Sequence, residues 1–173
     1  EESKKNSHNN AGNISSNNDY ILNEKPFINI KKELNERVKD YFNKVLSTTD
    51  SVTPYITQSW LNYTETNQYH HKHFHPNSLV SGIFYINCHK TLDKIKFFKE
   101  DYKIIKPEVK DWNLYNSESW WFTVKTRDLI MFPSSMMHMV ENKEGANTRI
   151  SLAFNVFVKG DLGSKQTLTE LKI

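Results

Sequence analysis

The chain contains little of what would mark a secreted, membrane-spanning or nucleic-acid-binding protein. Its single cysteine, Cys88, excludes an internal disulfide and favours a reducing, cytoplasmic compartment. No apolar run approaches the roughly 20 residues that cross a bilayer, so no membrane partner is expected. The 23 basic and 20 acidic residues give a net charge of +3, which is too even a balance to predict a nucleic-acid partner.

Glycine is also scarce, with 5 residues among 173, whereas aromatic residues make up 13% of the chain. This combination favours a sheet-rich core over a low-complexity chain. The length fits one domain, which we place at residues 25–173 after a polar tail at residues 1–24. Residues 1–19 are rich in Asn and Ser and typical of a disordered tail, although part of them could lie over the body of the fold. The sequence carries no indication of the oligomeric state.

Hydrophobic periodicity separates one helix from a series of short strands. Apolar residues recur at three- and four-residue intervals, which predicts an amphipathic helix over residues 30–47. Residues 100–118 are expected to form an irregular excursion anchored by Trp112 and Tyr115. We therefore expect a mainly β fold, with the helix packed on the outside of an antiparallel, barrel-like sandwich. Short runs rich in β-branched and aromatic residues predict strands at 54–63, 68–75, 79–87, 94–98, 119–125, 128–132, 136–140 and 148–158.

Histidines cluster just before one of these strands, at His70, His71, His73 and His75, and His138 lies far downstream in an apolar segment. Because side chains alternate in direction along a strand, His73 and His75 should share one face. Two imidazoles on one face would repel each other if both were protonated, so a bound cation is the simplest reason to keep them together. A His-x-His pair with one distant histidine supplies three nitrogen ligands and leaves coordination positions open for chemistry. We predict a catalytic metal at His73, His75 and His138, and interpret His70 and His71 as flanking polar residues.

The residues after the histidine pair extend this pattern. They read H-x-H-P-x-S-x-x-S-G-x-x-Y from His73 to Tyr85, and the final apolar strand opens at Arg149. Over about residues 55–158 the chain resembles the Fe(II)- and 2-oxoglutarate-dependent oxygenases, in particular a small phage and bacterial group of the prolyl-hydroxylase-like branch. The resemblance implies a double-stranded β-helix, which is a jelly-roll or cupin-like fold. It also implies Fe(II) and 2-oxoglutarate as cofactors, with ascorbate as an optional reductant.

For the metal, the resemblance assigns His73 to the first ligand and His138 to the distal ligand. His75 stands where the family has a carboxylate, and this is a departure from its pattern. A neutral imidazole in that place leaves the iron site one unit more positive, which the oxygen ligands of 2-oxoglutarate could partly offset. No Asp or Glu lies between His70 and Asp93, so an adjacent carboxylate cannot simply be reassigned.

For the co-substrate, the resemblance assigns Arg149 to the far carboxylate of 2-oxoglutarate. A guanidinium suits that role because it can hold both carboxylate oxygens at once. Ser151 lies two residues along the same strand and can donate a further hydrogen bond. Tyr85 matches a tyrosine that reaches the co-substrate carboxylate, and Asn62 and Tyr63 resemble another pair near the co-substrate.

Each of these residues also has a purely structural interpretation. Arg149 could form a surface salt bridge with Glu141 or Glu144, and Tyr85 could belong to the ordinary core. The apolar residues that could keep water from the metal could equally be core: Phe84, Phe132, Met136 and Met137.

The implied reaction is hydroxylation of a substrate coupled to decarboxylation of 2-oxoglutarate to succinate. The substrate could be a prolyl residue in a peptide or protein, or a small free molecule. The rival metal fold is a cupin, but cupins place a Glu where this chain has Leu79 and Val80. A non-catalytic metal- or ligand-binding module, in which His75 marks lost activity, stays open.

Overall fold

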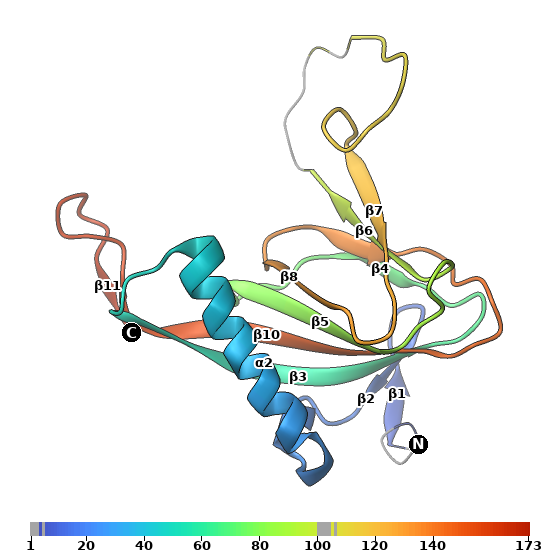
Figure 1. Cartoon of the computed structure of the whole chain (residues 1–173), viewed down its shortest axis with the longest axis horizontal. Coiled ribbons are helices and arrows are strands. Elements are labelled where there is room, and N and C mark those ends of the chain that lie inside the picture. The colour runs from blue at the N-terminus through green and yellow to red at the C-terminus, as the bar shows by residue number, and fades with distance from the viewer. Residues whose placement is uncertain (1–3, 5, 100–104, 106) are drawn as a thin grey trace.

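In the part of the chain that the structure describes, two antiparallel β-sheets pack with one long α-helix (Figure 1). The structure is a computed structural model, and it describes residue 4, residues 6–99, residue 105 and residues 107–173. Within these residues, the larger sheet has seven strands, ordered β1 (Ser7–Asn9), β2 (Ile14–Ser16), β3 (Val52–Thr64), β10 (Arg149–Leu162), β5 (Val80–Asn87) and β8 (Leu129–Pro133), with β11 (Leu171–Lys172) paired to β10. The smaller sheet is ordered β4 (His70–His73), β9 (His138–Val140), β6 (Lys94–Phe98) and β7 (Ser119–Thr123).

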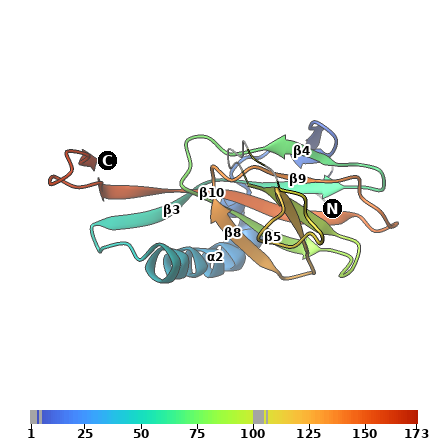
Figure 2. The same cartoon turned by 90° about the horizontal axis from the view of Figure 1, so that it is seen from above.

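The two sheets and the helix form layers. Figure 2 shows α2 (Ile28–Tyr41) on one side of β3 and β10, and β4 and β9 on the other side. Each strand segment predicted from the sequence overlaps a strand of the structure, and the mainly antiparallel β prediction is confirmed. The short strands β1, β2 and β11 were not predicted, because they lie in polar segments without a run of β-branched residues.

The predicted helix is also confirmed, with small shifts at its ends. α2 covers Ile28–Tyr41 and continues into a π-helical turn at Phe42–Leu46, which ends where Ser47 adopts a left-handed φ of 52°. Leu34 and Val38 recur at a four-residue interval and are buried against the larger sheet. In the part of the chain that the structure describes, no helix is long and apolar enough to span a membrane.

The main hydrophobic core fills the space between the helix and the larger sheet. Successive side chains of β3 and β10 point to opposite faces of the sheet, so only every second residue reaches this core. A smaller cluster of Tyr85, Ile95 and Val124 lies apart from it. The buried members of the main core are Ile21, Leu22, Leu34, Val38, Phe42, Leu61, Tyr63, Val80, Leu152, Phe154, Val156 and Val158.

The polar N-terminal segment is structured from Ser7 onward, so the alternative that it lies over the body of the fold holds for this part. β2 pairs with β3, and its serine side chains are buried. Ser15 Oγ donates a hydrogen bond to Asn62 Oδ1 at 2.8 Å, and the backbone N–H of Leu61 donates to Ser16 Oγ at 3.0 Å. Hydroxyls replace apolar side chains at this edge, which is why a hydrophobicity pattern misses it.

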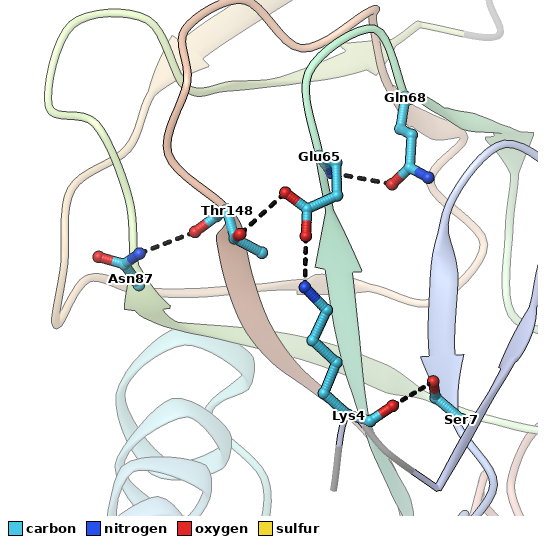
Figure 3. A network of polar contacts seen from close by, with 6 residues as sticks. All are labelled: Lys4, Ser7, Glu65, Gln68, Asn87 and Thr148. Atoms are coloured by element: carbon cyan, nitrogen blue, oxygen red, sulfur yellow. Dashed lines mark hydrogen bonds and ion pairs between the residues drawn. The ribbon is translucent and has the colours of Figure 1, made fainter. Parts of the chain in front are cut away.

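Figure 3 shows polar contacts that fasten the same segment to the ends of β3 and β10. Lys4 forms an ion pair with Glu65, and Thr148 Oγ1 donates to the other carboxylate oxygen of Glu65 at 2.8 Å. The hydrogen bond from Lys4 lowers the pKa of Glu65, so this carboxylate is charged at neutral pH. Asn87 Nδ2 donates to the carbonyl of Thr148 at 2.7 Å. These contacts hold the residue that precedes β10.

The prediction that Trp112 and Tyr115 anchor the irregular excursion is wrong. Trp112 and Tyr115 expose 66% and 87% of their surface, and neither belongs to a core cluster. Both residues lie between the paired strands β6 and β7, where the chain runs away from the body of the sheets (Figure 1). The remainder of the excursion at 100–104 and 106 lies outside the described residues.

Candidate metal centre and adjoining cavities

Three histidines from two distant stretches of the chain converge between the sheets. His73 and His138 are paired residues of β4 and β9, and their ring centroids lie 4.3 Å apart. His75 follows β4 and is held by a backbone hydrogen bond from its N–H to the carbonyl of Ser134, at 2.9 Å. Its ring lies 5.1 Å from that of His73 and 5.2 Å from that of His138. One nitrogen of each ring lies within 4.8 Å of the other two.

Backbone carbonyls fix the orientation of two of these rings. His73 Nδ1 lies 2.7 Å from the carbonyl oxygen of His71, and His138 Nδ1 lies 3.0 Å from that of Met136. A carbonyl can only accept, so each Nδ1 carries a proton and each Nε2 keeps its lone pair. This is the arrangement in which an imidazole offers Nε2 to a metal ion while its other nitrogen is anchored.

Side chains orient the third ring. His75 Nδ1 lies 2.6 Å from Asn155 Oδ1 and 3.0 Å from Ser81 Oγ. Ser81 Oγ also donates to Asn155 Oδ1 at 3.0 Å and contacts Ser134 Oγ at 2.8 Å. An amide oxygen accepts only, so the Nδ1 of His75 is also protonated and its Nε2 lone pair is also available. Ser81, the second serine of the H-x-H-P-x-S-x-x-S-G-x-x-Y pattern, thus supports the histidine ring.

The three imidazoles are uncharged at neutral pH. Burial lowers the pKa of His73 to about 4 and that of His138 to about 3. Burial also lowers the pKa of His75. This effect is larger than that of the hydrogen bond to Asn155, which raises the pKa. Neutral imidazoles are the form that binds metal ions, so no proton has to leave at pH 7 before a cation can bind.

His70 lies in the same region, although the sequence suggested only a flanking polar residue. The pairing of β4 with β9 shifts register between His70 and His73, as at a β-bulge. The bulge turns His70 toward the cavities beside the metal centre, and burial lowers its pKa to about 2. The signal that could have revealed this is the run of adjacent histidines, which a regular strand would divide between two faces.

A small cavity of about 30 Å³ adjoins the three histidines and contains most of the predicted co-substrate residues. Arg149, Tyr85, Ser151 and Asn62 all line it. Burial raises the pKa of Tyr85, so its hydroxyl stays protonated and can donate. Tyr63 does not reach this cavity, because it neighbours Asn62 on β3 and therefore points to the opposite face, into the helix-side core.

Arg149 is a buried cation with unused hydrogen-bonding capacity. Only 3% of its surface is exposed, so it is no surface salt bridge, and Glu141 pairs with Lys96 instead. Its Nη2 donates to Thr64 Oγ1 at 3.0 Å, while its buried Nε has no hydrogen-bond partner among the residues that the structure describes. An unpaired buried donor on a charged group costs free energy, which a carboxylate entering the cavity would recover.

The donor sets fit a divalent cation and an organic dianion side by side. Among the residues that the structure describes, the metal-ligand groups consist of histidines alone, so they bring no negative charge to a bound ion. Three neutral nitrogens leave positions open for oxygen ligands. The guanidinium of Arg149, which lines the same small cavity, provides the charge that an anionic ligand needs at its far end.

An open polar cleft of about 630 Å³ leads from the surface to His73 and His75. Its walls come from the N-terminal hairpin, β3, the β4 region and β10. Within the described residues, one carboxylate and no Lys or Arg line it. Its other lining residues are His8, Asn10, Ser15, Asp19, Thr57, Gln58, Trp60, His70, His71, Phe74, Pro76, Asn77 and Asn155.

A second large cavity, of about 600 Å³, is apolar and contains none of the three histidines. Phe97 and Phe132 line it, and their rings also lie 6.1 and 4.8 Å from that of His138. Phe132 and Met136, predicted as water-excluding wall or core, both line this apolar cavity. Phe84 packs against the helix-side core instead.

A family model described as "Putative 2OG-Fe(II) oxygenase" matches residues 58–155, which is more than half of the chain. The chain belongs to this family. The match includes the histidine cluster, His138 and Arg149, and the family's name confirms the expected cofactors, Fe(II) and 2-oxoglutarate. No curated protein sequence matches the chain significantly.

Solved structures of 2OG-Fe(II) oxygenases share the fold. An oxidoreductase of this family from Burkholderia pseudomallei has a TM-score of 0.62 at 11% identity, over 87% of this chain and 70% of that one. HygX from Streptomyces hygroscopicus, solved with nickel, 2-oxoglutarate and hygromycin B, has a TM-score of 0.57 at 10% identity, over 87% and 72%. A Pseudomonas putida prolyl-4-hydroxylase has a TM-score of 0.51 at 14% identity, over 84% and 68%. These similarities confirm the double-stranded β-helix.

Proposed function

We propose that the protein is an Fe(II)- and 2-oxoglutarate-dependent dioxygenase that hydroxylates its substrate, with His73, His75 and His138 as the iron ligands. The observation that carries this proposal is the convergence of three neutral imidazoles, each anchored through Nδ1, beside a cavity with a buried and incompletely paired guanidinium. When bound, Fe(II) with 2-oxoglutarate supplies an oxidant derived from dioxygen. The chain supplies orientation, charge and exclusion of water.

In this proposal the far carboxylate of 2-oxoglutarate enters the small cavity, whose volume of about 30 Å³ does not hold the whole molecule. Arg149 holds the far carboxylate of 2-oxoglutarate through paired N–H donors, including the Nε that lacks a partner. Tyr85, whose hydroxyl stays protonated, and Ser151 donate to the same carboxylate. Asn62, the cross-strand partner of Ser151 on β3, lines the same cavity. Tyr63 is not part of the proposed site, because it lies on the other face of β3.

The all-imidazole ligand set makes iron binding and co-substrate binding interdependent. Three neutral ligands leave a bound divalent cation with its full charge, whereas a carboxylate ligand would remove one unit. The two carboxylates of 2-oxoglutarate supply the missing negative charge, so each ligand should strengthen the binding of the other.

The cleft of about 630 Å³ is the proposed substrate entrance, because His73 and His75 lie among its lining residues. Amide side chains such as Asn10 and Asn77 can bond to a peptide backbone, and Trp60 offers an apolar surface near His75, at 5.6 Å between ring centroids. These features suit an uncharged prolyl residue in a peptide or protein. A small, polar free molecule would use the same chemistry.

A non-catalytic metal- or ligand-binding module is the second candidate, and one observation favours it. His75 takes the place at which a carboxylate would lower the charge of the iron site, so binding could persist without turnover. A cupin has no comparable support, since the matched family is the oxygenase family.

Succinate formation decides between these functions. The protein is incubated with Fe(II), 2-oxoglutarate and ascorbate, with and without proline-containing peptides, and succinate is measured by mass spectrometry. An oxygenase forms succinate in the absence of substrate at a low rate and faster with the right peptide. His138→Ala should abolish this turnover, whereas His89→Ala, at an exposed position outside the site, should leave it unchanged. Iron and 2-oxoglutarate binding without any succinate would establish the binding module.

A further inference from the structure

A second group of imidazoles lies on β4 itself, at the edge of the polar cleft. The ring centroids of His70, His71 and His73 are 4.4 to 5.2 Å apart, and one nitrogen of each lies within 4.8 Å of the other two. The bulge in β4 produces this arrangement, since a regular strand would turn adjacent residues to opposite faces. The group therefore has three nitrogen ligands in reach of a common centre.

The rings of His70 and His71 are free to adjust to an ion. His70 Nε2 faces Asn10 Nδ2 at 3.5 Å, which is long for a hydrogen bond. His71 is exposed, and its ring lies beside the rings of His70 and His73. Nitrogens on a tetrahedral zinc ion are about 3.4 Å apart, so rotations that move the rings by about 1 Å complete the site.

His73 belongs to both groups of three histidines, and it can serve only one ion at a time. Its Nδ1 donates a hydrogen bond to the carbonyl of His71, so Nε2 holds the one lone pair that a neutral imidazole has to offer. An ion bound with His70 and His71 therefore removes His73 from the group that it forms with His75 and His138.

We propose that His70, His71 and His73 form a second metal site, which binds Zn²⁺ and competes with the first site for His73. An all-imidazole site with room for a water molecule suits zinc, and nitrogen ligands bind zinc more tightly than they bind Fe(II). The exposure of His71 gives an ion direct access from the cleft. The second site does not depend on the proposed function. Only the description of the first site as an iron centre rests on that function.

Zinc titrations by calorimetry on the metal-free protein test the proposal in a background that lacks the first site. His138→Ala removes one ligand of the first group and none of the second. It should still bind one zinc ion. Adding His71→Ala should weaken that binding by about 100-fold, because losing even a residue that only supports a metal ligand costs about 10- to 100-fold in affinity. Adding His89→Ala instead, which removes an exposed histidine elsewhere, should change nothing. His75→Ala provides a second background if the buried His138→Ala variant does not fold.

The wild-type protein should bind one zinc ion per chain, because the two sites share a ligand. Two ions per chain with separate affinities would overturn the competition. Residual zinc binding in His138→Ala that does not respond to His71→Ala would overturn the site, and so would the loss of all binding in both backgrounds.

The same titrations separate this inference from the proposed function. If the wild-type protein binds zinc and neither His138→Ala nor His75→Ala does, the first site stands and the second fails. If zinc binding in His138→Ala depends on His71, but the wild-type protein binds no Fe(II) with 2-oxoglutarate and forms no succinate, the second site stands and the proposed function fails.

Discussion

The two faces of the β3–β10 pair differ in chemistry, although they are made by alternating residues of the same strands. On the helix side, Leu61, Leu152 and Phe154 are fully packed among apolar neighbours. On the other side, Asn62, Ser151 and the guanidinium of Arg149 line a cavity, and a buried donor of Arg149 has no partner in the described part of the chain. The helix-side face is apolar and packed, whereas the other face keeps polar groups around a cavity.

This difference predicts that stability and ligand binding can be altered separately. A packed apolar face contributes to the free energy of folding through burial and dispersion contacts. A face that keeps unpaired polar groups contributes little to folding and gains its free energy when a ligand satisfies those groups. Substitutions on opposite faces of β10 should therefore act separately, one on ligand binding and the other on stability.

Arg149→Ala should have the largest effect on ligand affinity, and it should act on binding alone. The dissociation constant of 2-oxoglutarate should rise by about 100-fold, because a charge-assisted, paired contact is lost. The free energy of unfolding should not fall, because the variant removes a buried cation that lacks a full set of partners. Isothermal titration with Mn²⁺ present measures the affinity, and Arg37→Ala on the exposed face of α2 is the control. Unchanged affinity would remove Arg149 from the site.

Leu152→Ala tests the other face. Leu152 is completely buried, so its truncation should lower the free energy of unfolding by about 3 kcal/mol through lost transfer energy and a residual cavity. Its 2-oxoglutarate and metal affinities should stay within about twofold of wild type, measured on folded protein. Leu46→Ala, at a position 42% exposed, should cost less than about 0.5 kcal/mol in the same urea titration. A large loss of ligand affinity in Leu152→Ala would mean that the two faces are coupled.

Gly82→Ala should destabilise the protein by about 2 kcal/mol, because the sheet leaves no room for a methyl group there. A Cβ at Gly82 would lie 2.1 Å from Cζ of Phe154, its cross-strand partner on β10. This contact gives a structural reason for the glycine of the S-G pair in the motif. In a double-mutant cycle with Phe154→Leu, the smaller side chain should relieve most of the added cost. Additive losses would show that the ring is not the obstacle.

Acid should weaken the metal-free protein through the histidines of the ligand-binding face. The pKa of His73 and that of His138 lie at about 4 and about 3 in the folded protein, below the ordinary value of 6.5. Below pH 6.5 the unfolded chain therefore binds protons that the folded chain does not, and stability falls as the pH is lowered. Between pH 7 and pH 5.5 the loss should be about 1 kcal/mol for each of these two histidines.

Urea unfolding in the presence of a chelator measures this loss. His138→Gln should reduce it, because the replacement has no proton to gain in this range. Stability that is constant or rises on acidification would contradict the burial of neutral imidazoles.

The strand pattern was readable from the sequence because it depends on local chemistry. Alternating β-branched and aromatic residues, separated by turn residues, predicted every strand with a substantial apolar face. The same alternation correctly placed Arg149 and Ser151 on one face of β10. It also shows that Asn62 and Tyr63, as neighbours on one strand, could not both line one cavity.

Other features depended on contacts between distant segments. The N-terminal hairpin joins the larger sheet through serine hydroxyls and an ion pair between Lys4 and Glu65, and a hydrophobicity pattern does not register either. The position of His70 depends on a bulge in the pairing of β4 with β9. Trp112 is exposed because of where the chain between β6 and β7 lies in the fold. Its aromatic side chain alone predicts burial and does not indicate that position.

The sequence by itself determined the periodicities, and through them the helix, most of the strands and the face of each strand on which a side chain lies, because backbone geometry converts spacing into direction. Only the tertiary structure decided which faces meet. It brought β4 beside β9, set the register that pairs His73 with His138, and buried Arg149 next to them. Pairing register and sheet order arise from the summed packing of many residues far apart in the chain, so no local pattern contains them.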